Sequence, residues 1–200
     1  MPKNELEIVV LGWGGLIWSP EPMKVEGRWH YDGPMLPIEF ARISRGIFST
    51  RERLTLVPYE GSRYVPVLWT KTPYNLLSDA IKALAGREGC KIEFIGYVRP
   101  DIGERNCNVI PDMYRPIVSW ARSKKINAVI WADLPSNFYD RTGKLLTEYN
   151  IIEFVREMRQ SGNIEAKEYV EKAPAQIKTR FREVIENEFG IAKAASINGQ

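Results

Sequence analysis

The hydrophobic positions of this 200-residue chain fall into short extended runs and longer helical faces. An apolar, β-branched run at residues 8–11 is typical of a buried strand. Similar short runs predict further strands at residues 38–44, 53–58, 63–70, 92–98 and 126–131. Three of these runs follow one another closely between residues 38 and 70, which favours antiparallel pairing over a crossover through a helix.

Apolar residues recur at helical spacing in other segments, which predicts helices at residues 73–85, 112–124 and 147–160. Thr72 and Pro73 suit the cap and the first position of the first helix. Residues 164–189 predict one or two helices with a break near Pro174. We expect residues 19–37 to form a long irregular connection and the last ten residues to fray.

Three glycines, Gly12, Gly14 and Gly15, follow the first predicted strand directly. Such a cluster marks a turn with unusual backbone angles or a close approach of another group to the backbone. Successive N–H groups in a turn of this kind can converge on an anion. A tight strand connection without a ligand explains the same residues, and the pattern alone leaves both interpretations open.

The composition is that of a globular protein, and it predicts one domain over residues 1–200. The 28 basic and 25 acidic residues nearly balance at a net charge of +3, which does not favour nucleic-acid binding. We expect no membrane span, because no apolar run approaches 18 residues, and no signal peptide, because the N-terminal residues carry acids and only a short apolar stretch. Cys90 and Cys107 are far apart, which favours reduced thiols and a cytoplasmic location. With His30 as the sole histidine, we predict no metal site.

The glycine cluster also resembles a known signature. Residues 12–18, Gly-Trp-Gly-Gly-Leu-Ile-Trp, are similar to the Gly-Tyr-Gly-Ser-Leu-Ile-Trp segment of the γ-glutamyl cyclotransferase-like superfamily, in particular of its ChaC-type branch. Five of the seven positions match, while Trp13 and Gly15 each replace a residue that carries a hydroxyl. The resemblance implies an α+β fold with a small mixed β-barrel surrounded by helices. It also implies that the loop binds the glutamyl part of a substrate through Gly12, Trp13, Gly14, Gly15, Leu16 and Ile17.

A second point of resemblance is Arg87-Glu88-Gly89, which is similar to the family segment that carries the catalytic glutamate. The predicted position of Glu88, between a helix and a strand, agrees with that family context. The residues alone favour a solvated glutamate near a helix end, and only the resemblance favours the functional role. Glu39 is the rival carboxylate, because it interrupts an apolar strand. We expect Glu39 to form a structural ion pair with Arg42, although it could line the same pocket.

The reaction that the resemblance implies is the release of 5-oxoproline from a γ-glutamyl amine or peptide, without metal or organic cofactor. The alternative is a non-catalytic small-molecule-binding or interaction protein of the same fold, which the changes at Trp13 and Gly15 would favour. The resemblance covers residues 7–98. Residues 110–190 are predicted either to complete the barrel or to cover it, and no oligomeric state is predicted.

Overall fold

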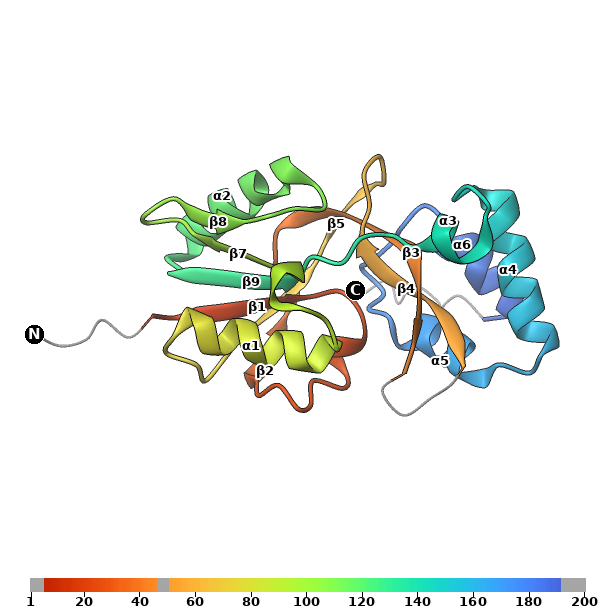
Figure 1. Cartoon of the computed structure of the whole chain (residues 1–200), viewed down its shortest axis with the longest axis horizontal. Coiled ribbons are helices and arrows are strands. Elements are labelled where there is room, and N and C mark those ends of the chain that lie inside the picture. Colours follow the sequence, from red (N-terminus) through yellow and green to blue (C-terminus); the bar gives the residue numbers. More distant parts are fainter. Residues whose placement is uncertain (1–5, 47–50, 192–200) are drawn as a thin grey trace, which may run out of the picture.

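The computed structural model describes residues 6–46 and 51–191, and it confirms the α+β class (Figure 1). The strands form a six-stranded mixed sheet and a three-stranded antiparallel sheet, and helices pack on both. Within the described residues neither sheet closes on itself, so the predicted barrel is wrong. No helix in this part of the chain is long and apolar enough to cross a lipid bilayer.

The six-stranded sheet is built around β1 (Ile8–Gly12), which is the first predicted strand. It pairs antiparallel with β6 (Leu68–Lys71) and parallel with β9 (Ala128–Ala132). The outer strands are β2 (Glu26–His30) beside β6, then β7 (Ile95–Arg99) and β8 (Glu104–Asn106) beyond β9. All five residues of β1 are buried, as expected for an interior strand with a helix on each face.

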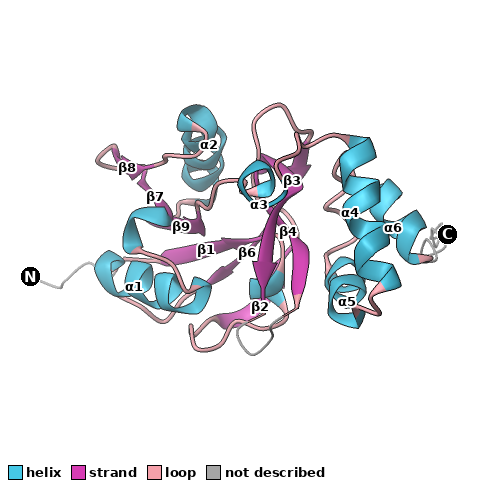
Figure 2. Ribbon diagram, turned by 45° about the vertical axis from the view of Figure 1, so that its right-hand side comes forward, coloured by secondary structure: helices cyan, strands magenta, loops and turns pink. Residues whose placement is uncertain are grey.

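Alternate residues of β1 pack against two different helices. Ile8 and Val10 belong to a buried cluster with Leu84 of α1 (Leu77–Glu88). Val9 belongs to a second cluster with Ile117 of α2 (Tyr114–Lys124). This division follows from the two-residue period of a strand, and Figure 2 shows α1 and α2 on opposite sides of β1.

The second sheet has the order β4 (Glu52–Pro58), β3 (Met35–Arg45), β5 (Tyr64–Pro66). The single strand predicted at residues 63–70 is in fact β5 and β6, which lie in different sheets. Between them, Val67 donates its N–H to the carbonyl of Pro34 and accepts the N–H of Gly33. These two hydrogen bonds take Val67 out of both ladders, so the chain passes from one sheet to the other.

The C-terminal helices cover the β3–β4 hairpin (Figure 1). They are α3 (Phe138–Thr142), α4 (Glu148–Gln160), α5 (Ile164–Lys172) and α6 (Arg182–Phe189). The break predicted near Pro174 separates α5 from α6, and the buried guanidinium of Arg182 donates to carbonyls of this segment. Residues 110–190 therefore supply strand β9 to the six-stranded sheet as well as the helices that cover the hairpin.

Several local boundaries differ from the predictions. Helix α1 begins at Leu77 instead of Pro73, because Thr72 extends β6 and donates both its N–H and its hydroxyl to the carbonyl of Ile8. The helix runs on to Glu88, and Gly89 follows it with a left-handed φ of 61°. Short 3₁₀ turns at Ile92–Phe94 and Pro111–Met113 replace or precede predicted regular structure, and a third such turn lies at Gly15–Ile17.

Strands β2 and β8 and helix α3 were not predicted, and β2 lies inside the segment expected to be irregular. These elements are only three to five residues long, so they carry too few positions for a periodic pattern. The predicted fraying of the last ten residues falls almost entirely outside the described residues.

The carboxylate of Glu39 is buried inside β3 and forms no ion pair with Arg42, which corrects that expectation. Its two oxygens accept the backbone N–H groups of Phe40 at 2.8 Å and of Arg180 at 2.9 Å, with Phe181 at 3.4 Å. The segment before α6 is thus fixed to β3 by one side chain. Burial raises the pKa of Glu39 above its usual 4.5, although the nearby Thr179 hydroxyl and the backbone hydrogen bonds oppose the shift.

A raised pKa in the folded state makes the contribution of Glu39 to stability depend on pH. Above pH 4.5 the folded protein retains a proton that the unfolded chain loses, so stability falls as pH rises through this window. Glu39→Gln removes the titration. We expect the wild-type free energy of unfolding to fall relative to that of Glu39→Gln between pH 4.5 and 7, as measured by urea denaturation. A difference that stays constant over this range would contradict the prediction.

Candidate functional site

A cavity of about 830 Å³ lies between the two sheets. It is lined by the loop after β1, the end of α1, the β3–β4 hairpin and α5. Gly12, Trp13, Gly14, Gly15 and Leu16 line it together with Glu88. Ile17 and Glu39 are not among the lining residues, so the structure brings Glu88, but not its rival, to the glycine loop.

The glycine loop turns away from the sheet through a single 3₁₀ turn at Gly15–Ile17. Ile17 donates to the carbonyl of Gly14 at 2.9 Å, and Ser19 donates to that of Gly15 at 3.0 Å. The N–H groups of Trp13, Gly14 and Leu16 have no acceptor among the described residues. These donors border the cavity, where they can bind an oxygen atom of a ligand.

Glycine is required at two loop positions because other groups come very close to the backbone. A Cβ atom on Gly12 would lie 2.7 Å from the indole ring of Trp29. A Cβ atom on Gly14 would collide with the hydroxyl of Tyr169. At Gly15 the nearest atom is Nη2 of Arg87, at 3.2 Å, on a side chain that can move. The close approach predicted from the glycine cluster is therefore a property of this turn.

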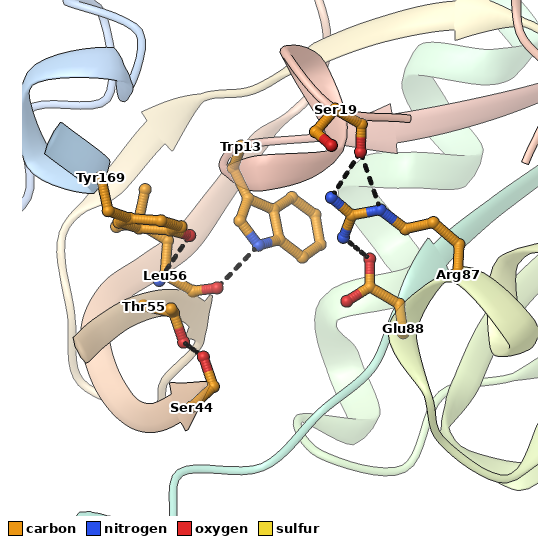
Figure 3. A network of polar contacts seen from close by, with 8 residues as sticks. All are labelled: Trp13, Ser19, Ser44, Thr55, Leu56, Arg87, Glu88 and Tyr169. Atoms are coloured by element: carbon orange, nitrogen blue, oxygen red, sulfur yellow. Dashed lines mark hydrogen bonds and ion pairs between the residues drawn. The ribbon is translucent and has the colours of Figure 1, made fainter. Parts of the chain in front are cut away.

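Two aromatic side chains attach the loop and α5 to the edge of the second sheet (Figure 3). Strand β4 is an edge strand, so its outward backbone groups need partners from elsewhere. The indole Nε1 of Trp13 donates to the carbonyl of Leu56 at 3.1 Å, and the N–H of Leu56 donates to the hydroxyl of Tyr169 at 3.3 Å. The only polar atom of the Trp13 side chain is therefore engaged in a hydrogen bond to the backbone of β4, and Trp13 is only 5% exposed.

The carboxylate of Glu88 is held at the cavity wall by its neighbour in the chain. Its Oε1 lies 2.6 Å from Nη1 of Arg87, and the Glu88 side chain is 16% exposed. Arg87 also donates from Nε and Nη2 to the carbonyl of Ser19, at 3.2 and 2.8 Å (Figure 3). The guanidinium offsets a negative charge that the C-terminal end of α1 disfavours. No described residue donates to Oε2 of Glu88, so this oxygen can accept a proton.

The other charged residues of the cavity wall are mostly basic. They are the cations Arg42, Arg45, Arg53 and Lys172 and the anions Glu21 and Glu165. Cys90 lines the same wall, and burial, with a further contribution from Glu88, raises the pKa of its thiol to about 11. The thiol therefore stays protonated near neutral pH, and it does not supply a nucleophile there. A cavity of this charge favours a ligand that carries negative groups.

No pattern along the chain pointed to Tyr169 or to the polar pair of Ser44 and Thr55. Tyr169 lies on an amphipathic helix, where an aromatic residue usually packs in the core. It lies at the cavity only because α5 packs on β4, a contact between distant segments. Ser44 donates to the hydroxyl oxygen of Thr55 across the β3–β4 pair at 3.1 Å. A pairing of this kind depends on the register and not on any local motif.

Within residues 6–46 and 51–191, no three His, Cys, Asp or Glu side chains come together as metal ligands would. Comparison of the chain with family models, with curated proteins and with solved structures gives no match. The case for a function therefore depends on the geometry of the cavity and on the two short segments that resemble a known family.

The contact between Gly14 and Tyr169 can be tested by a pair of substitutions. Gly14→Ala should lower the free energy of unfolding by about 1–3 kcal/mol, because the new Cβ displaces the Tyr169 hydroxyl. Adding Tyr169→Phe removes that hydroxyl, so the double variant should lose less than the sum of the single changes. Chemical denaturation of the four proteins measures both effects. Strictly additive losses would contradict the proposed contact.

Proposed function

We propose that the chain is a γ-glutamyl cyclotransferase-like enzyme that releases 5-oxoproline from a γ-glutamyl amine or peptide. The observation that carries this proposal is the shared cavity of Glu88 and the Gly12–Leu16 loop. Both segments resemble functional segments of that family, and they come from distant parts of the sequence. A chance resemblance would not require them to meet at one cavity.

The chemistry needs one base and a set of hydrogen-bond donors. Oε2 of Glu88 takes a proton from the α-ammonium group of the substrate. The free amine then attacks its own γ-carbonyl, which closes a five-membered ring and gives a tetrahedral oxyanion. The intermediate collapses when the C–N bond to the leaving amine breaks, and the leaving nitrogen takes the proton back from Glu88. The ring nitrogen, which still carries two protons, gives one of them to the released amine, so the products are 5-oxoproline with a neutral ring amide, an ammonium ion and the Glu88 carboxylate. The nucleophile belongs to the substrate, so the protonated thiol of Cys90 is not needed.

The loop supplies the donors that this reaction requires. The unpaired N–H groups of Trp13, Gly14 and Leu16 can stabilise the oxyanion, and they are fixed before the substrate arrives. The changes at Trp13 and Gly15 remove hydroxyl groups that the family signature has. They remove no backbone N–H group, so the donors on which the proposal depends are retained.

A second candidate function is a binding protein that retains the cavity without the chemistry. It is favoured by one observation, the use of the Trp13 indole N–H to pack against Leu56. Because its indole N–H already donates to Leu56, the Trp13 side chain has no polar atom that could bind a substrate.

The proposal predicts that Glu88→Gln lowers kcat for 5-oxoproline release by about 10²–10⁴-fold, because the amide has no basic oxygen for the proton. Substrate binding and the melting temperature should change little, since the shape of the side chain is kept. The measurement is 5-oxoproline release from a panel of γ-glutamyl amines and peptides.

Glu93→Gln is the matched control, because Glu93 lies in the nearby Ile92–Phe94 turn, is 61% exposed and does not line the cavity. Glu39→Gln tests the rival carboxylate. Full activity in Glu88→Gln together with loss in Glu39→Gln would move the base to β3. No release from any substrate by the wild-type protein would favour the binding protein.

A further inference from the structure

A β-bulge in β3 determines which side chains of the β3–β4 hairpin face the cavity. Phe40 pairs with Leu56, but the next pair along the ladder is Arg42 with Thr55, so β3 has one extra residue. Opposite residues in an antiparallel pair point to the same side, whereas neighbours along a strand point to opposite sides. Arg42 and Phe40 therefore point to opposite sides, although a regular strand would place them on the same side.

The bulge thus sends Phe40 into the core and Arg42 to the cavity wall. Phe40 is fully buried, and Arg42 lines the cavity together with Ser44 and Thr55. The segment after β9 fixes this geometry. The Ser136 hydroxyl donates to the carbonyl of the extra residue, Ala41, and Nη1 of Arg42 donates to the carbonyl of Pro135 at 2.7 Å.

Arg42 differs from the other cations of the cavity in having no acidic partner. Each of the others forms an ion pair, namely Arg45 with Glu52, Arg53 with Glu165, Arg87 with Glu88 and Lys172 with Glu168. Arg42 is half-buried, and it forms no ion pair with any residue in the described part of the chain. A partly desolvated guanidinium without a counterion is costly, and an anionic ligand would compensate it.

We propose that Arg42 binds the α-carboxylate of the γ-glutamyl substrate, an inference that rests on the proposed function. The α-carboxylate and the α-amine are attached to the same carbon atom. The group that binds the carboxylate must therefore lie near the base that deprotonates the amine. Arg42 and Glu88 line one cavity, and one cation with one carboxylate complements this zwitterionic end of the substrate.

The electrostatics of Arg42 agree with this placement. Burial lowers the pKa of the guanidinium, whereas the nearby Cys90 and Glu88 raise it. Arginine nevertheless remains protonated in proteins, and its planar fork can bind both oxygens of a carboxylate. The hydrogen bond from Nη1 to Pro135 orients the fork, and the remaining N–H groups stay available for a ligand.

The inference is tested by removing the carboxylate from the substrate and the guanidinium from the protein. γ-Glutamyl-p-nitroanilide and 4-aminobutanoyl-p-nitroanilide differ only in the α-carboxylate, and ring closure releases p-nitroaniline from both. The wild-type protein should turn over the first with a kcat/KM about 10²-fold higher. Arg42→Gln should lower kcat/KM for the first substrate by about 10²-fold and leave the second unchanged. The preference for the carboxylate then disappears.

Further variants separate Arg42 from its neighbours. Arg42→Lys keeps the charge without the fork, so it should retain part of the preference, and it replaces Arg42→Gln if that variant does not fold. Arg115→Gln removes one charge from the exposed face of α2, outside the cavity, and should leave both rates unchanged. Loss of the preference in Arg53→Gln, with the preference retained in Arg42→Gln, would overturn the inference.

A binding measurement distinguishes failure of this inference from failure of the proposed function. By titration calorimetry, the wild-type protein should bind 5-oxoproline more tightly than 2-pyrrolidinone, which lacks the carboxylate, and Arg42→Gln should bind the two alike. This pattern without turnover of either anilide would refute the enzymatic function alone and support the carboxylate site. Equal wild-type affinity for both compounds would overturn the inference, whatever the turnover.

Discussion

The attachment of two aromatic side chains to Leu56 is the constraint on which the cavity depends. Strand β4 is an edge strand, and an edge strand leaves backbone groups that must find partners or bind water. Trp13 from the loop after β1 satisfies the carbonyl of Leu56, and Tyr169 from α5 satisfies its N–H. Three segments that are distant in sequence therefore meet at the backbone of a single residue, Leu56. The cavity lies where they meet, between the two sheets.

This arrangement also explains why the first loop is rich in glycine. The Tyr169 hydroxyl can reach Leu56 only because Gly14 has no side chain in its path. The same lack of side chains leaves the loop N–H groups open to the cavity. Packing and ligand binding both require a residue without a side chain at position 14. The presence of Gly14 alone therefore does not distinguish a structural loop from a functional one. The nearby Glu88 carboxylate takes no part in the contacts of Trp13 and Tyr169 with Leu56, and its place at the cavity favours the functional interpretation.

The parts of the fold that the sequence predicted are those determined locally. The β-branched run of β1 and the helix capped by Thr147, whose hydroxyl accepts the N–H of Asn150, both follow from neighbouring residues. The division of residues 63–70 between two sheets does not, because it depends on hydrogen bonds between Val67 and distant residues. The predicted pairing of Glu39 with Arg42 failed for the same reason. Two of its three partners, Arg180 and Phe181, lie near the other end of the chain.

The sequence likewise predicted some residues of the candidate site and missed others. The resemblance pointed to the glycine loop and to Glu88, and the structure places both at one cavity. Tyr169 and the cavity-facing orientation of Arg42 arise from helix docking and from a bulge, which no local pattern encodes.

Residue 15 is glycine where the similar family segment has serine, and the position of Arg87 offers a physical reason for the difference. Nη2 of Arg87 lies 3.2 Å from the position that a Cβ atom at Gly15 would take, so the guanidinium occupies space beside this residue. The same guanidinium binds the carbonyl of Ser19 and the carboxylate of Glu88. One cation therefore joins the turn after β1 to the end of α1 and fixes the distance between them. Glycine at position 15 leaves room for Arg87, which links the loop to the carboxylate of Glu88.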